Sequence, residues 1–265
     1  MLQLSLKNQD TIIAERKHEQ ETYLAFKNYE YQPGDTIELI VAQQDCFVWV
    51  QVDEAIEPSL IFVKNHRWTY DVVLEESLRQ AYSPKAFAGK KHYLRAWFPT
   101  LKEVTSYRNL ARNAHDQKDE TGAYPHAFAN VETRNDSTFF ARNAIDGMLA
   151  NEDHGPYPYQ SWGINQRKDA EITIDFGREI EINQVAIVLR GDYPHDSYWT
   201  SVTLELSDGS EHVFETTDKL DRQFFTLPMT KVTWVKLKDL IKHEDESPFP
   251  ALTQLEVYGR DRMFD

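Results

Sequence analysis

The sequence has one cysteine, no long apolar run and no secretory start, and each shortage excludes a class of protein. Among 265 residues only Cys46 carries a thiol, so the chain cannot form an internal disulfide. Cys46 lies in the apolar run 46–50, which predicts a small buried hydrophobe in a reducing compartment. No apolar run approaches the roughly 18 residues of a membrane span. The first twenty residues lack the basic start, apolar core and small-residue cleavage site of a secretory signal. We therefore expect a cytoplasmic protein without a membrane partner.

Basic residues are also in short supply. The chain has 29 Lys and Arg against 43 Asp and Glu, a formal net charge of -14. An acidic surface repels phosphate backbones, and no stripe of Lys or Arg offsets it locally. Nucleic acid is therefore not an expected partner.

The sequence also lacks the common motifs of enzyme active sites. The sequence contains no GxSxG elbow, P-loop, GxGxxG or HExxH, and the one thiol lies in a strand-like run. We therefore predict that the protein is not an enzyme. The alternative, a cytoplasmic enzyme of sugar metabolism, would need two carboxylates, for which Asp192 and Asp196 in an aromatic loop are the candidates.

Short runs of alternating apolar and polar residues dominate what is present. This period of two is typical of strands, and turn signals separate the runs about every ten residues. One short helix is expected over residues 74–82, ending before Pro84. The pattern predicts an all-β protein of two tandem β-sandwich, jelly-roll domains, residues 1–105 and 106–265. Trp49, Trp68 and Trp97 lie in strand patterns and are expected in the first core, whose role stays open between a spacer, a second binding module and a dimer interface.

Six segments of the second domain follow one another in a familiar order. They are residues 109–114 (NLARNA), 139–147 (FFARNAIDG), 161–163 (SWG), 172–177 (ITIDFG), 182–190 (INQVAIVLR) and 255–259 (LEVYG). In order and spacing this part resembles the F5/8 type C, or discoidin-like, domains of the galactose-binding-like fold. The resemblance implies an eight-stranded jelly roll without a catalytic centre, whose loops at one end bind most often a terminal sugar of a glycan.

Two loops have the composition of a sugar site, which needs aromatic rings for C–H faces and planar polar groups for hydroxyls. They span residues 151–160 and 190–199. The predicted sugar-binding residues are Tyr157, Tyr159, His154, Arg190, Tyr193 and His195.

Each of these residues also has a structural interpretation. Arg190 can simply pair with Asp192 or Asp196, and loop histidines are commonly solvated. Trp162 and Trp199 flank strands and are expected in the core. Phe249 can serve as a platform for a sugar or as a hydrophobic plug.

The resemblance also implies one structural Ca²⁺ near the AIDG segment, held by an Asp carboxylate, backbone carbonyls and a Glu beside the last strand. Asp146 matches the carboxylate, but the Glu position holds Gln254, with Glu256 two residues on. Calcium prefers six to eight hard oxygens, and a neutral amide weakens such a site. Asp146 and Gln254 are the candidate ligands, with calcium binding left open.

The leading hypothesis is thus a non-catalytic, lectin-like protein that binds a glycan or small sugar. The alternative is a protein-interaction or assembly module, as a homo-oligomer or with a protein partner, because the same jelly roll can dock peptides and subunits. Composition does not name the sugar, since specificity depends on loop geometry.

Overall fold

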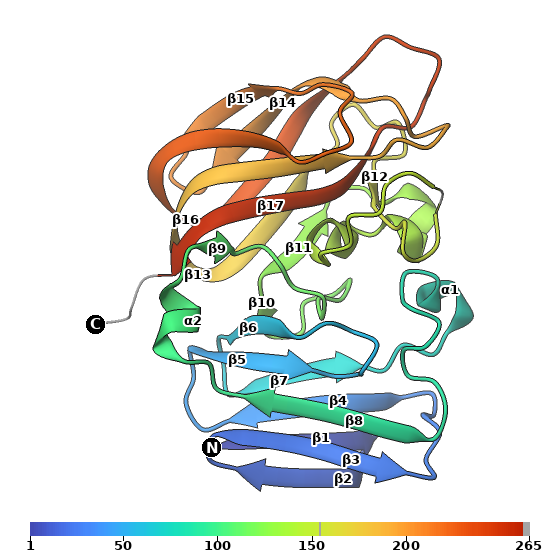
Figure 1. Cartoon of the computed structure of the whole chain (residues 1–265), viewed down its shortest axis with the longest axis vertical. Coiled ribbons are helices and arrows are strands. Elements are labelled where there is room, and N and C mark those ends of the chain that lie inside the picture. The colour runs from blue at the N-terminus through green and yellow to red at the C-terminus, as the bar shows by residue number, and fades with distance from the viewer. Residues whose placement is uncertain (154, 262–265) are drawn as a thin grey trace.

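The computed structural model describes residues 1–153 and 155–261 and is built almost entirely from antiparallel sheets (Figure 1). The all-β prediction is confirmed. Among the described residues, no helix combines the length and apolar character needed to cross a membrane.

Two sheets form the N-terminal part, at the bottom of Figure 1. The first has the strand order β2 (Thr11–His18), β1 (Leu2–Asn8), β4 (Asp35–Val41) and β7 (Arg67–Asp71). The second has the order β10 (Ala123–Tyr124), β6 (Ser59–Val63), β5 (Cys46–Gln51), β8 (Lys91–Trp97) and β3 (Glu21–Lys27). The apolar faces of both sheets meet in one core because alternate residues of each strand point inward.

Strand β5 shows how this alternation sorts the side chains. Val48 and Val50 are buried in the core, whereas Phe47 and Trp49 point to the other face. Trp49 stacks on Trp97 with ring centroids 5.8 Å apart, and both are half-buried outside the core. The expectation of a core position is thus confirmed for Trp68 but wrong for Trp49 and Trp97.

A third, strongly bent sheet forms the C-terminal part around a separate core. Its order is β12 (Trp162–Gly163), β17 (Ala251–Asp261), β13 (Ile172–Leu189), β16 (Gln223–Lys242), β14 (Trp199–Leu206) and β15 (Glu211–Glu215), with β11 (His126–Ala129) on β13 and β9 (Arg108–Asn109) on β17. Bulges interrupt the β13–β16 pairing, which lets these long strands bend without ending. Trp162 and Trp199 are fully buried here, as expected.

Helices are few and short: α1 (Glu76–Arg79), α2 (Leu101–Thr105) and the 3-10 helices η1 (Thr133–Asn135), η2 (Ser137–Phe139) and η3 (Ala141–Ile145). The helix expected over residues 74–82 is therefore shorter than predicted. Strand β2 was not foreseen, because it is a sheet edge whose residues are mostly exposed and polar.

The chain between α2 and β11 joins the two parts. β10 pairs with β6 of the N-terminal part, and β11, two residues on, pairs with β13 of the C-terminal part. Ala114 and Ala123 pack in the N-terminal core although they follow α2. The boundary between residues 105 and 106 stays a prediction.

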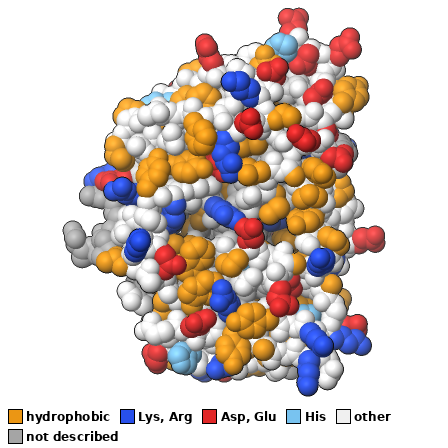
Figure 2. Space-filling view, viewed as in Figure 1, with side chains coloured by type: hydrophobic (Ala, Val, Ile, Leu, Met, Phe, Trp, Pro, Cys, Tyr) orange, Lys and Arg blue, Asp and Glu red, His pale blue; other side chains and the backbone are white. Residues whose placement is uncertain are grey.

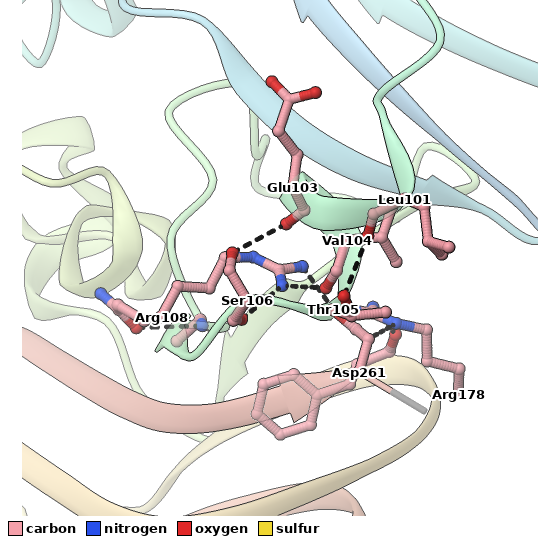
Figure 3. Close-up of polar contacts among 11 residues, drawn as sticks. Leu101, Glu103, Val104, Thr105, Ser106, Arg108, Arg178 and Asp261 are labelled. Atoms are coloured by element: carbon pink, nitrogen blue, oxygen red, sulfur yellow. Dashed lines mark hydrogen bonds and ion pairs between the residues drawn. The ribbon is translucent and has the colours of Figure 1, made fainter. Parts of the chain in front are cut away.

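Asp261 ties this joint together (Figure 3). Its carboxylate accepts hydrogen bonds from Arg108 and, at 2.6 Å, from Nε of Arg178. The guanidinium of Arg178 also lies over the rings of Phe47 and Phe62, 4.6 and 5.1 Å from their centroids. One buried carboxylate therefore orients an arginine of β13 against the outer face of the N-terminal sheet.

Candidate functional site

The loops at one end of the C-terminal sheet enclose a cavity of about 310 Å³, here called the loop pocket. Aromatic rings from three segments wall it: Phe139 from η2, His195 from the loop before β14, and Phe249 from the loop between β16 and β17. The His195 ring lies 5.7 Å from that of Phe139 and 6.1 Å from that of Phe249. Figure 1 shows the β16–β17 loop projecting at the upper right.

Polar groups stand beside these rings. Arg134 is exposed, and its guanidinium lies 5.6 Å from the Phe139 ring centroid. Asn165 is exposed, and its backbone N–H donates to Thr133 Oγ1 at 2.9 Å. Both Arg134 and Asn165 adopt left-handed backbone conformations, with φ of 53° and 50°. Such conformations are uncommon outside glycine and gather at functional sites.

Gly163 lines the pocket at a position where a larger residue would not fit. A Cβ there would lie 2.7 Å from Thr133 Oγ1 and 2.8 Å from the Phe139 ring. The glycine of the SWG segment thus lets strand β12 approach both residues closely.

Hydrogen bonds between the loops hold the walls of the pocket in place. The Phe249 N–H donates to the carbonyl of Pro194 at 3.3 Å. Ser197 Oγ donates to Asp245 at 2.8 Å, and Ser247 Oγ donates to Asp196. These bonds order the loops in advance, which lowers the entropic cost of binding.

Arg190 lies beneath this surface rather than on it. Its side chain has 0% exposure, and it donates to Asp192 Oδ1, to Ser161 Oγ and to the carbonyl of Asp153. Asp192 Oδ2 lies 3.0 Å from Nδ1 of His195. Arg190 therefore holds Asp192, and Asp192 holds the His195 ring at the pocket. In this conformation the guanidinium faces protein acceptors and not the solvent.

The other predicted sugar residues are not gathered with His195. Tyr193 is exposed at 74%, Tyr159 is half-buried, and His154 lies outside the described residues. Tyr157 lines a different cavity, and its N–H donates to the carbonyl of Gln80 in the N-terminal part at 2.7 Å. The two loops do meet at their bases, where Gly191 N–H donates to the carbonyl of Asn151 at 2.8 Å. The tyrosines of these loops do not line the loop pocket, and the sugar-binding roles stay predictions.

Sequence reasoning missed Arg134, Phe139 and Asn165 as pocket residues. Phe139 lies in one of the family-like segments, and no motif of the sequence includes Arg134 or Asn165. The useful signal is Gly163, since a glycine next to a buried tryptophan indicates a close approach.

Asp146 and Gln254 lie together, as a calcium site would need, but the groups facing Asp146 are donors. Oδ1 accepts from Met148 N–H at 2.8 Å and from Gln254 Nε2 at 2.9 Å, and Oδ2 accepts from Gln160 Nε2 at 2.6 Å. Burial raises the pKa of Asp146 to about 6, against the lowering effects of Arg142 and these hydrogen bonds. This donor set does not fit a Ca²⁺ ion, which needs a cage of oxygens. Within residues 1–153 and 155–261, no cluster of three His, Cys, Asp or Glu side chains could hold a metal.

No known family model matches the chain, and no curated protein matches it in sequence. Similar solved structures do exist. A single-residue variant of chitosan-binding module 1 from a chitosanase/glucanase of Paenibacillus sp. IK-5 is 20% identical, covering 58% of this chain and 100% of its own, with a TM-score of 0.41. The family 32 carbohydrate-binding module of NanJ from C. perfringens, in complex with galactose, is 15% identical over 58% and 99% with a TM-score of 0.42.

A fucose-binding module of Streptococcus pneumoniae is 14% identical over 59% of this chain and 98% of its own, with a TM-score of 0.38. The similarity to carbohydrate-binding modules thus spans a little over half of the chain, and it concerns the fold alone.

Proposed function

We propose that the protein binds a neutral sugar, without catalysis, in the loop pocket. The observation that carries the proposal is the wall of three rings, Phe139, His195 and Phe249, with Arg134 and Asn165 beside it. Sugar rings present C–H faces that pack on aromatic rings, while their hydroxyls need planar polar partners at the rim. A rigid, partly apolar cavity of about 310 Å³ supplies both in one place.

The charge around the pocket favours a neutral sugar over an anionic one. The β16–β17 loop carries Glu244, Asp245 and Glu246 just before Phe249. Acidic side chains gather at this end of the molecule on the face shown in Figure 2. A sulfated or carboxylated glycan would be repelled by these groups, whereas a neutral glycan would not.

The residues divide into two roles in this proposal. Phe249 and Arg134 contact the sugar, because both reach the surface of the pocket. Arg190 and Asp192 position the His195 ring from below.

A binding assay on the full chain tests the proposal. An array of neutral and anionic glycans identifies the ligand, and titration calorimetry then compares Phe249→Ala and Arg134→Ala with the parent. Loss of a central aromatic contact should weaken binding by about tenfold or more. The matched control is Phe224→Ala, which removes an exposed phenylalanine of β16 that does not line the pocket. A folded protein that binds no glycan, or equal affinity in Phe249→Ala, would overturn the proposal.

A further inference from the structure

A further cavity lies between the two parts of the molecule and is separate from the loop pocket. It measures about 560 Å³, and its walls include Val73 and Tyr82 from the N-terminal part and Phe140 and Arg142 from the C-terminal part. A second cavity of about 270 Å³ shares Tyr82 and Arg142 with it. We call the two together the inter-sandwich crevice. Figure 1 shows α1 beside the short helices that carry this wall.

Arg142 is the unusual residue of the crevice. It is only 4% exposed, and its guanidinium lies 4.5 Å from the Tyr82 ring centroid. Its Nε is buried without a hydrogen-bond partner, and among the described residues no carboxylate or carbonyl accepts a hydrogen bond from its guanidinium. A guanidinium keeps its charge at every ordinary pH, and a buried charge without an acceptor is costly. Such a group in a native fold requires an explanation.

The two carboxylates whose charges act on Arg142 do not supply that acceptor. Asp146 and Asp116 act on Arg142 through their charge, but neither forms an ion pair with it in the described residues. Asp146 is held by Met148, Gln160 and Gln254, as described above. Asp116 accepts from Ala127 N–H at 2.9 Å and faces Nδ1 of His126 at 2.8 Å. Both carboxylates are thus engaged elsewhere.

The rest of the crevice is suited to a small molecule. Val73 and Phe140 are buried and apolar, so they offer an apolar wall in the same cavity as the guanidinium. The acidic side chains that line the larger cavity, Asp71, Glu75 and Asp119, are exposed and oppose an anionic ligand, while Lys118 of the same lining offsets part of their charge. The volume falls within the ordinary range of small-molecule sites, about 300–1,000 Å³.

We propose that the inter-sandwich crevice binds a small-molecule carboxylate, with the carboxylate on Arg142 and the body of the ligand against Phe140. The fork of a guanidinium matches the two oxygens of a carboxylate, and such charge-assisted bonds strengthen where water is excluded. The ligand's carboxylate would accept the hydrogen bonds of Arg142 for which the described residues provide no acceptor. The inference is independent of sugar binding in the loop pocket.

The test pairs each carboxylate with its neutral amide. D-glucuronate and benzoate are titrated into the full chain alongside glucuronamide and benzamide, and the arginine Nε–H signals are followed by NMR. We expect one protected Nε–H signal to shift with at least one carboxylate and with neither amide. The amide should bind about tenfold to a hundredfold more weakly, because it loses a charged hydrogen bond. Inorganic phosphate, as a third probe, distinguishes a carboxylate site from a general oxyanion site.

Two variants assign the site. Arg142→Met should abolish carboxylate binding, while Arg134→Met, which removes an exposed arginine of the loop pocket, should leave it unchanged. Phe249→Ala should also leave it unchanged, so failure of the sugar proposal and failure of this one are distinguishable. Equal shifts with acid and amide, binding of phosphate alone, or unchanged binding in Arg142→Met would overturn the inference. If Arg142→Met does not fold, the titration of the parent protein still tests the inference, because a protected arginine Nε–H signal must shift with a carboxylate and not with its amide.

Discussion

Two arginines are buried in the C-terminal part, and their surroundings differ in kind. Arg190 under the loop pocket has acceptors for Nε, Nη1 and Nη2, all from the protein. Arg142 in the inter-sandwich crevice has none in the described chain, although it is almost as buried. Arg190 holds Asp192, which positions the His195 ring in the pocket wall, whereas the charge of Arg142 faces a cavity. Burial alone therefore does not tell whether a charged side chain is structural, and its acceptors do.

Removal of Arg190 should have the largest effect on stability. Arg190→Met breaks the buried ion pair between Arg190 and Asp192, and breaking a buried pair by removing one partner typically costs about 3–5 kcal/mol of unfolding free energy. Urea unfolding measures the change. Arg167→Met is the control, because its pair with Asp169 is exposed, and its stability should match the parent. An Arg190→Met protein as stable as the parent would contradict the support role.

The pH dependence of stability tests the surroundings of Asp146. Its pKa is raised from 3.8 to about 6 by burial, so the folded state holds the proton more tightly than the unfolded state. The stabilisation is complete below the unfolded pKa and is lost as the pH rises through the folded pKa. Relative to Asp146→Asn, the parent should lose up to about 3 kcal/mol between about pH 4 and pH 7.

Asp146→Asn is suited to this comparison because Gln160 Oε1 is buried without a hydrogen-bond partner. Once the Gln160 amide turns over, this oxygen can accept a hydrogen bond from the side-chain NH₂ of the new Asn. Urea unfolding of both proteins across this pH range gives the difference. A difference that does not fall with rising pH would show that Asp146 is ionised in the fold throughout.

Removal of Arg142 should have little effect on stability or raise it slightly. Arg142→Met orphans no described acceptor and fills the space with an apolar chain, and apolar replacements of buried charges are often neutral or stabilising. The melting temperature near pH 5, where Asp146 is protonated, is the measurement. A loss as large as that of Arg190→Met would mean that Arg142 has a structural partner after all, and the contrast between the two arginines would fail.

Calcium should have the smallest effect. Asp146 already accepts three hydrogen bonds from nitrogen donors, which leaves no oxygen cage for a cation. The melting temperature should be the same in calcium and in chelator. A calcium-dependent rise would require Gln254 and Gln160 to turn their oxygens inward, since a ligand that binds only the folded state raises its stability.

The sequence predicted the sheets well, because alternation reports directly which face of a strand is buried. Val48 and Val50 and the buried Trp162 follow from it. It could not predict where loop side chains point, because that depends on segments far away in the chain. Tyr157 lines a cavity that it shares with Tyr82 of the N-terminal part. Arg190, which follows a buried strand, stays inside.

The exposure of Arg142 to a cavity was equally beyond the sequence. Arg142 lies in a family-like segment, and no local pattern shows that Tyr82 of the other part covers it. Trp49 and Trp97 illustrate the same limit, since the period of two gives two faces but does not say which one the rest of the protein leaves open.

Calorimetric titration of the full chain with a neutral glycan selected on the array, compared with its Phe249→Ala variant, tests the central claim most directly. The account predicts saturable binding to the parent, weakened about tenfold or more in the variant, with an unchanged melting temperature. Equal affinities in the two proteins, or no binding by a folded parent, would contradict sugar binding in the loop pocket.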